Sequence, residues 1–201
     1  MTAGQRLIRV ITNVVVRWPR LWPVFRPIVR RTFDRIAPAW EGIRMEDTLA
    51  PYEAALDRVP GPVERAVDVG TGTGAGARVL RQRFPEAAVV GVDVAPAMLA
   101  EARRHAPEIS FVEGDAARLP FEDASFDLAA HANMIPFVRE AARVLRPGGW
   151  TLFAFSSGPD TPIWVEPTTL RRELERRGFS DFAEIAAGRG IAVVARKAQQ
   201  D

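Results

Sequence analysis

The chain has 201 residues, of which 47% are hydrophobic and 26% are charged, as is usual for a soluble globular protein. The length suits one domain, and no apolar run reaches the ~18 residues of a membrane span. Wholly disordered, fibrous and membrane-spanning classes are therefore excluded. The absence of cysteine excludes disulfides and thiolate metal sites and favours a cytoplasmic protein.

The charge is unevenly distributed along the chain. Residues 1–33 contain seven arginines and no acidic residue, so the remainder carries 27 − 7 = 20 basic and 25 acidic residues. The pI of about 9.8 accompanies a formal net charge of only +2, because few groups titrate between pH 7 and about 10. The sequence therefore predicts an arm of charge +7 on a body of charge −5.

The arm has the periodicity of an amphipathic helix, with arginines on one side and apolar residues on the other. Pro19, Pro23 and Pro27 each remove a backbone donor, so we expect a break near Trp18 and a short second helix before Phe33. We predict that residues 1–46 form a basic helical arm or lid and that residues 47–201 form the main domain.

From residue 47 onward, helical and strand-like segments alternate. Asp47 is expected to cap a helix that ends near Arg58. Strands are predicted at 65–69, 88–93, 109–113, 125–130, 149–155, 181–186 and 190–196, and helices at 74–84, 96–105, 134–146 and 167–178. This alternation predicts an α/β fold in which a seven-stranded, mostly parallel sheet has helices on both faces. The short link at Gly188–Gly190 makes the last strand antiparallel.

A glycine-rich turn, VDVGTGTGAG at 67–76, follows the first strand. Such a turn brings the backbone and helix N–H groups close to a ligand. Gly72-x-Gly74-x-x-Ala77 also satisfies the dinucleotide pattern, and Asp93 lies 19 residues beyond Gly74, where a ribose-binding acid belongs. The turn alone therefore leaves a nicotinamide cofactor open.

Two further acids favour another ligand. Asp68 precedes the first glycine by two residues, where it suits an ammonium group better than a pyrophosphate, and Asp115 follows the third strand, where it could accept from an adenine amino group. A ligand with an amino-acid end, a ribose and an adenine satisfies Asp68, Asp93 and Asp115 together. S-adenosylmethionine is such a ligand.

Four ordered segments carry a resemblance to a known family: VDVGTGTG at 67–74, VVGVDVAPAMLAEAR at 89–103, FVEGDAARLPFEDASFDL at 111–128 and ARVLRPGG at 142–149. On the basis of these four segments, the chain resembles a class I S-adenosylmethionine-dependent methyltransferase of the small-molecule type. The resemblance implies a Rossmann-like fold, S-adenosylmethionine as cofactor and S-adenosylhomocysteine as product. A segment at 33–40 is also similar, although the family usually has Tyr where Trp40 stands.

The resemblance also implies roles for individual residues. The glycine-rich turn would border the methionine moiety with Asp68 near its amino group, Asp93 would bind the ribose hydroxyls, and Asp115 with the Ala116 backbone would bind the adenine edge. The residues assigned to the cofactor are Asp68, Gly70, Thr71, Gly72, Gly74, Asp93, Val94, Met98, Asp115, Ala116 and His131. No metal site is expected.

Methyl transfer from a sulfonium depends largely on alignment, which can supply ~7–11 kcal/mol, so a dedicated base is optional. His131, expected just past the fourth strand, is a candidate base or a cofactor contact. Trp22, Trp40 and Asn133 are candidate acceptor-binding residues, and Trp18, Phe25 and Phe33 are further candidates for an apolar lining. Asn133 begins a segment that departs from the Asn-Pro-Pro-aromatic motif, which disfavours methylation of DNA or protein nitrogen.

The sequence leaves several alternatives open. The expected acceptor is a small, lipophilic molecule methylated at O, C or N, whereas the alternatives are an NAD(P)-dependent oxidoreductase and a non-catalytic cofactor-binding or nucleic-acid-binding module. No specific nucleic acid partner is expected. The arm could cover the pocket, contact a membrane surface peripherally, or pack on the body or a second subunit in a homodimer. Membrane association is the alternative to a purely cytoplasmic location.

Overall fold

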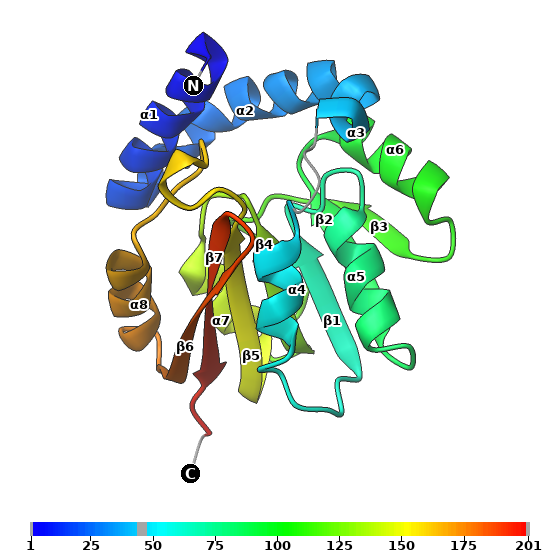
Figure 1. The fold of residues 1–201 in the computed structure, drawn as a ribbon, viewed down its shortest axis with the longest axis vertical. Helices are drawn as coiled ribbons and strands as arrows, with labels where there is room; N and C mark the ends of the chain where they lie inside the picture. The colour runs from blue at the N-terminus through cyan, green and yellow to red at the C-terminus, as the bar shows by residue number, and fades with distance from the viewer. Residues whose placement is uncertain (1, 44–47, 200–201) are drawn as a thin grey trace.

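Seven strands form one mixed sheet through the centre of the molecule (Figure 1). The computed structural model describes residues 2–43 and 48–199. The strand order is β3-β2-β1-β4-β5-β7-β6, with β7 antiparallel to both of its neighbours. The strands are β1 (Arg65–Val69), β2 (Ala88–Asp93), β3 (Ser110–Glu113), β4 (Phe126–Ala132), β5 (Leu145–Phe155), β6 (Phe179–Ala187) and β7 (Gly190–Lys197). The predicted α/β fold with an antiparallel last strand is confirmed.

Alternate residues of the central strands supply two cores, one on each face of the sheet. One core joins Ala66 of β1 and Leu152 of β5 to residues from helices α4 (Ala50–Leu56), α5 (Ala75–Arg83) and α6 (Pro96–His105). The other joins Val67 and Phe153 to helices α7 (Val138–Val144) and α8 (Pro167–Glu175). Because both faces are covered, the central strands are apolar on both sides. Figure 1 shows α4 and α5 on the near side of the sheet.

The N-terminal segment consists of α1 (Ala3–Arg17), the 3-10 turn η1 (Pro19–Leu21), α2 (Trp22–Ile36), the 3-10 turn η2 (Ala37–Ala39) and α3 (Trp40–Ile43). The predicted break near Trp18 is confirmed, but the prediction of a short second helix is wrong, because α2 continues through Pro27 to Ile36. Pro23 lies in the first turn, where its missing N–H costs nothing. Packing of Trp22 and Val29 stabilises the helix despite the donor missing at Pro27.

Other boundaries also differ from the predictions. Helix α7 begins at Val138 and ends at Val144, so it is shorter than the predicted 134–146, and β5 begins at Leu145. His131 lies within β4 rather than past it. The predicted cap Asp47 lies outside the described residues, and α4 begins at Ala50.

The arm crosses the edge of the sheet at which the parallel strands end (Figure 1). Arg9 donates to the carbonyls of Pro159 and Pro162, which follow β5, around the 3-10 turn η3 (Gly158–Asp160). Farther along, Arg30 pairs with Glu113 at the end of β3, with 3.4 Å between nitrogen and oxygen. The Asp34 carboxylate accepts from Ala97 N–H at the start of α6, which follows β2.

The arm also contributes a core of its own. Ile8, Ile11, Val15, Trp22 and Val29 are buried in a cluster with Ile135 and Ile163, which follow β4 and β5. The sequence predicted the apolar stripe of the arm but not its partners, because these partners come from distant loops. Among the described residues, no helix combines the length and the apolar character needed to cross a membrane.

A pair of neighbouring substitutions tests whether the arm is part of the cooperative fold. Ile11 is 1% exposed and Val10 is 58% exposed, on the same helix. Ile11→Ala should lower the free energy of unfolding by about 2–5 kcal/mol because it leaves a cavity, whereas Val10→Ala should change it by less than about 0.5 kcal/mol. Urea unfolding measures both, and equal effects of the two substitutions would contradict the observed docking of α1.

Candidate functional site

Three acids stand at or beside the carboxyl ends of three neighbouring strands. Asp68 lies in β1, Asp93 ends β2 and Asp115 follows β3 by two residues. The register pairs Asp68 with Gly91 and Asp93 with Glu113. Because the ends of parallel strands share one edge, with neighbours about 4.8 Å apart, the three acids form a row along that edge. The structure therefore brings together residues that the sequence separates by more than 40 positions.

Asp68 is almost fully buried, and its carboxylate connects three elements. Oδ1 accepts from the Tyr52 hydroxyl of α4 at 3.1 Å, and Oδ2 accepts from the Thr71 hydroxyl at 2.6 Å. The Ala77 N–H of α5 also donates to this carboxylate. Gly76 makes the close approach of α5 possible, because a Cβ at this position would lie 2.6 Å from Oδ1. Asp68 thus connects the glycine-rich turn to α4 and α5.

Burial raises the pKa of Asp68 from 3.8 to about 6, although the hydrogen bonds from Thr71, Tyr52 and Ala77 lower it. Burial and the neighbouring Asp68 also raise the pKa of the Tyr52 hydroxyl above its usual value. At neutral pH the carboxylate is therefore ionised, and it is the charged partner in a buried pair with a neutral phenol.

The glycine-rich turn adopts left-handed conformations that favour glycine. Gly70, Gly72 and Gly74 have φ of +70°, +54° and +83°. A Cβ added at Gly72 would meet nothing within 4 Å, so this side of the turn faces open space. Asp93 supports the turn, because its Oδ2 accepts from Gly72 N–H and its Oδ1 from Ala95 N–H, both at 2.9 Å. Burial raises the pKa of Asp93.

Asp115 is held by the arm. Its Oδ1 accepts from the indole N–H of Trp22 at 2.7 Å and from Ala117 N–H at 2.9 Å, and its Oδ2 accepts from Arg26 at 3.0 Å. A carboxylate offers about four acceptor positions, so one position on Oδ2 remains. Trp22, predicted as an acceptor-binding residue, lies beside Phe137 with 5.2 Å between ring centroids.

The loop that carries Asp115 is fastened on its other side by α7. Glu140 accepts from Leu119 N–H and pairs with Arg143 at 2.7 Å. Arg143 also donates to the carbonyls of Leu119 and Phe121. The chain therefore holds the loop at both ends, by α2 near Asp115 and by α7 near Leu119.

His131 lies near the end of β4 and is 3% exposed. Its Nδ1 is 2.9 Å from the Leu152 carbonyl oxygen, which can only accept, so Nδ1 carries the proton and Nε2 keeps its lone pair. The imidazole stacks on Phe153 with centroids 4.0 Å apart. Burial lowers the pKa of His131 to about 4. The side chain is therefore a neutral hydrogen-bond acceptor and a weak base at neutral pH.

The other predicted residues lie around this row. Asn133 has φ of +51°, and its side-chain oxygen accepts from Ser156 N–H, which joins the ends of β4 and β5. Val94 and Ala116 are half-buried next to Asp93 and Asp115. Met98 is buried against Ala37 of the arm.

The aromatic residues of the arm divide between its two sides. Trp40 lies edge-on to Phe33, with 5.7 Å between ring centroids. Phe25 and Phe33 pack against the core of the arm. The predicted inward orientation of Trp18 is wrong, because this side chain is 57% exposed. It follows the last residue of α1, and the chain turns there into η1.

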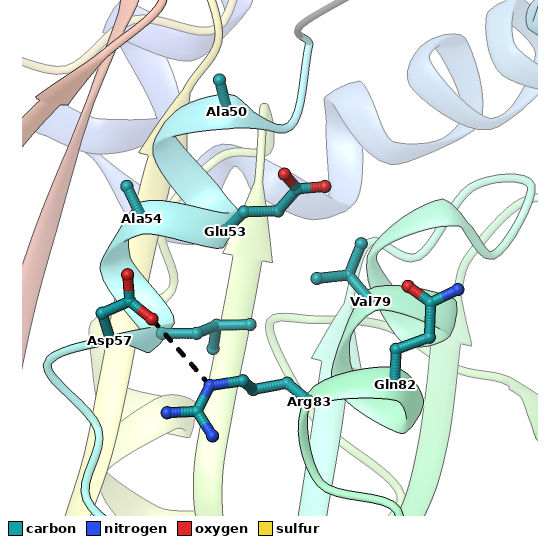
Figure 2. Close-up of a pocket in the computed structure, with 8 residues that line it drawn as sticks. Ala50, Glu53, Ala54, Asp57, Val79, Gln82 and Arg83 are labelled. Atoms are coloured by element: carbon teal, nitrogen blue, oxygen red, sulfur yellow. Dashed lines mark ion pairs between the residues drawn. The ribbon is translucent and has the colours of Figure 1, made fainter.

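A separate hollow lies between α4 and α5 and is shown in Figure 2. Its lining includes Glu53, Asp57, Gln82 and Arg83, and Arg83 and Asp57 form an ion pair at 4.0 Å. None of the predicted site residues lines it. We therefore assign the candidate site to the carboxyl edge of the sheet.

Sequence reasoning missed several residues of this site. Tyr52 lies in a short helix without a motif, and nothing in the sequence indicates its contact with Asp68. Arg26 was one arginine among seven within residues 1–33. Glu41 accepts a hydrogen bond from the Thr73 hydroxyl of the glycine-rich turn, which brings the end of the arm to β1.

The site suits an adenosine cofactor with an amino-acid end. Gly72 faces open space, Asp115 has one free acceptor position, and the row of acids favours a cationic rather than a phosphorylated ligand. These features define a Rossmann-like cofactor-binding domain whose ligand carries amino and hydroxyl donors.

Comparisons with known proteins agree with this class. Residues 66–149 match the methyltransferase domain family. A demethylmenaquinone methyltransferase of Thermus thermophilus is 44% identical over 136 residues, which cover 58% of this chain and 60% of the relative. A trans-aconitate 2-methyltransferase of Methylobacterium nodulans is 40% identical over 114 residues, which cover 52% and 43%.

A Haloferax volcanii methyltransferase, solved in complex with the activator Trm112, has the same fold with a TM-score of 0.70 and 22% identity. The alignment covers 83% of this chain and 98% of that chain. This chain therefore contains a methyltransferase domain at residues 66–149, and S-adenosylmethionine is the cofactor that this domain indicates. It spans only about half of the two curated relatives, at 60% and 43% of their lengths.

The raised pKa of Asp68 predicts a pH-dependent contribution to stability. The folded state binds this proton more tightly than the unfolded state, whose pKa is near 3.8. The stabilising contribution is therefore complete below about pH 4 and is lost as pH rises through about 6. Relative to Asp68→Asn, the free energy of unfolding of wild type should fall as pH rises through this window and stay constant above it. Thermal melts from pH 4 to 8 measure the difference, and a pH-independent difference would contradict the buried ionisation.

Proposed function

We propose that this protein transfers the methyl group of S-adenosylmethionine to a small, lipophilic acceptor. The row of Asp68, Asp93 and Asp115 along one sheet edge is the observation that carries the proposal. Two ribose hydroxyls and an adenine amino group would present donors to Asp93 and Asp115. The buried negative charge of Asp68 would attract an ammonium group across the glycine-rich turn. A nicotinamide dinucleotide is disfavoured, because its pyrophosphate would bring negative charge to the side of the buried Asp68 carboxylate.

The residues that would hold the cofactor follow from this order. Gly70, Gly72, Gly74 and Thr71 would border the methionine moiety above Asp68. Asp93 would accept from the ribose, and Asp115 with Ala116 would bind the adenine edge. Val94 would contact the adenine directly, whereas the buried Met98 would act by packing against the arm.

When bound, S-adenosylmethionine supplies a methyl group that moves in line from its sulfonium sulfur to the acceptor atom. This chain's own contribution is alignment and exclusion of water. His131 would use the lone pair of Nε2 to orient an O–H or N–H group of the acceptor. Its low pKa makes it a poor base at neutral pH, so the role we propose for it is orientation.

The acceptor class is inferred from the arm. The two relatives are named for demethylmenaquinone and for trans-aconitate, which differ greatly in polarity, so similarity alone does not choose between them. The arm carries four aromatic side chains where it crosses the strand ends: Trp22, Phe25, Phe33 and Trp40. Their apolar rings favour a lipophilic acceptor. Asn133 would contribute its amide NH₂, because its oxygen is used by Ser156. We propose that residues 1–46 serve as the lid of this site.

Calorimetric titration with S-adenosylhomocysteine tests the cofactor assignment. Asp93→Asn removes the charge that would receive the ribose hydroxyls, and binding should weaken about 10- to 100-fold, as expected for charge-assisted hydrogen bonds. The control is Glu86→Gln, which neutralises an exposed acid near the opposite end of β2 and should bind as wild type does. Tight binding of NAD without binding of S-adenosylhomocysteine would overturn the assignment.

The contact between the arm and Asp115 provides a second test. Trp22→Phe combined with Arg26→Gln removes both arm donors to Asp115 while keeping an aromatic ring beside Phe137. The Kd for S-adenosylhomocysteine should rise about 3- to 10-fold, because Asp115 loses the bonds that orient it. Arg31→Gln, an exposed position on the same helix, is the control. If the double variant keeps wild-type affinity, the arm does not orient the adenine site.

A further inference from the structure

The arm has a second apolar surface, on the side turned away from the body. Six large hydrophobic side chains are 40 to 66% exposed among the described residues, and all six lie between positions 7 and 28. They are Leu7, Val10, Trp18, Leu21, Val24 and Ile28. We call these six residues the outer face. Among the described residues, no other large hydrophobic side chain is exposed to this extent, so the outer face is a distinct surface.

The outer face is separate from the stripe that packs on the body. In α1, Leu7 and Val10 are exposed, whereas a second set of apolar residues is buried: Ile8, Ile11 and Val15. At 100° per residue, the centres of these two sets lie about 100° apart around the helix, so the exposed set flanks the buried stripe. In α2, Trp22 and Val29 face the body, while Val24 and Ile28 face away from it. The amphipathic pattern alone predicted one apolar side, but the arm has two.

Arginines accompany this surface. Four of them are exposed, and their guanidinium groups make no hydrogen bond or ion pair with another described residue: Arg6, Arg17, Arg20 and Arg31. By contrast, Arg9, Arg26 and Arg30 connect the arm to the body. The outer face is therefore accompanied by four arginines whose positive charges have no acidic partner. No acidic residue occurs within residues 1–33.

We propose that the outer face docks on the surface of an anionic lipid bilayer. Acidic headgroups would pair with the free arginines, and the apolar side chains would enter the boundary with the acyl chains. Trp18, at the junction of α1 and η1, has the amphipathic ring that favours this boundary. The helices would lie along the membrane, because neither is long and apolar enough to cross it.

Charge and hydrophobicity together argue against a second copy of this chain or a nucleic acid as the binding partner of the outer face. A second copy of this chain would bring two sets of unpaired arginines together, since a two-fold contact places the same patch on both sides. A nucleic acid would satisfy the arginines but leave six apolar side chains in water. An anionic bilayer satisfies both parts of the surface.

The arrangement places the membrane on one side of the arm and the candidate site on the other. Trp22 and Arg26 of α2 contact Asp115 on the inner side, while Val24 and Ile28 of the same helix lie on the outer side. The proposal goes beyond the proposed function and does not depend on it, because membrane binding can be measured without turnover.

Vesicle flotation of the full chain tests the proposal, with phosphatidylcholine vesicles that contain or lack phosphatidylglycerol. Wild type should float with the anionic vesicles and remain in solution with the neutral ones, and added salt should reduce binding. Arg17→Gln with Arg20→Gln should weaken the partition coefficient about 30-fold, because each arginine near an anionic surface contributes about fivefold. Val24→Ser with Ile28→Ser should also release the protein while leaving its charge unchanged.

The matched control is Arg172→Gln with Arg177→Gln, which removes two exposed arginines of the body, one in α8 and one just after it. This variant should float as wild type does, and circular dichroism spectra that match wild type in all variants would show that they remain folded. Absence of flotation with anionic vesicles would overturn the proposal, and so would equal loss in the control. Sedimentation without lipid adds a third criterion: a dimer that the Val24 and Ile28 substitutions dissociate would assign the outer face to self-association instead.

Discussion

The buried carboxylate of Asp68 is the group on which the organisation of the site depends. It accepts hydrogen bonds from Tyr52 in α4, from Thr71 in the glycine-rich turn and from the first turn of α5. An isolated buried charge would be costly, and these donors make its burial possible. Their directions in turn determine how the glycine-rich turn leaves β1. The next residue of the turn, Gly72, has an open side and donates its N–H to Asp93.

A second set of interactions connects the arm to the strand ends. Arg9, Arg26 and Arg30 contact residues that follow or end β5 and β3, and Asp34 and Glu41 reach the residues after β2 and β1. The positive arm and the negative body therefore meet through specific pairs. Trp22 and Arg26 donate to Asp115, so the arm is connected directly to the carboxylate that we propose binds adenine.

Much of the fold was predictable because its signals are local. The bounds of β1, β2 and α6 agree with the predictions, since short apolar runs and helix-terminating residues define them. The predicted end of α7 was too late, because Leu145 continues directly into β5 and pairs with Phe126. The extent of α2 was underestimated, because its stability comes from packing of Trp22 and Val29 rather than from local preference.

The sequence by itself determined the order of elements, the motifs of a methyltransferase domain and the three acids that follow from them. Periodicity, turn residues and spacing are properties of neighbouring positions, so they can be read along the chain. The tertiary structure alone decided that Tyr52 reaches Asp68, that the arm binds Asp115, that Trp18 points outward and that His131 is a weak base. These features depend on contacts between distant segments and on burial, which the sequence pattern does not contain. The arm shows the difference most clearly, because its sequence predicts a charge of +7 and one apolar stripe, while the fold determines which arginines are paired and which apolar side chains stay exposed.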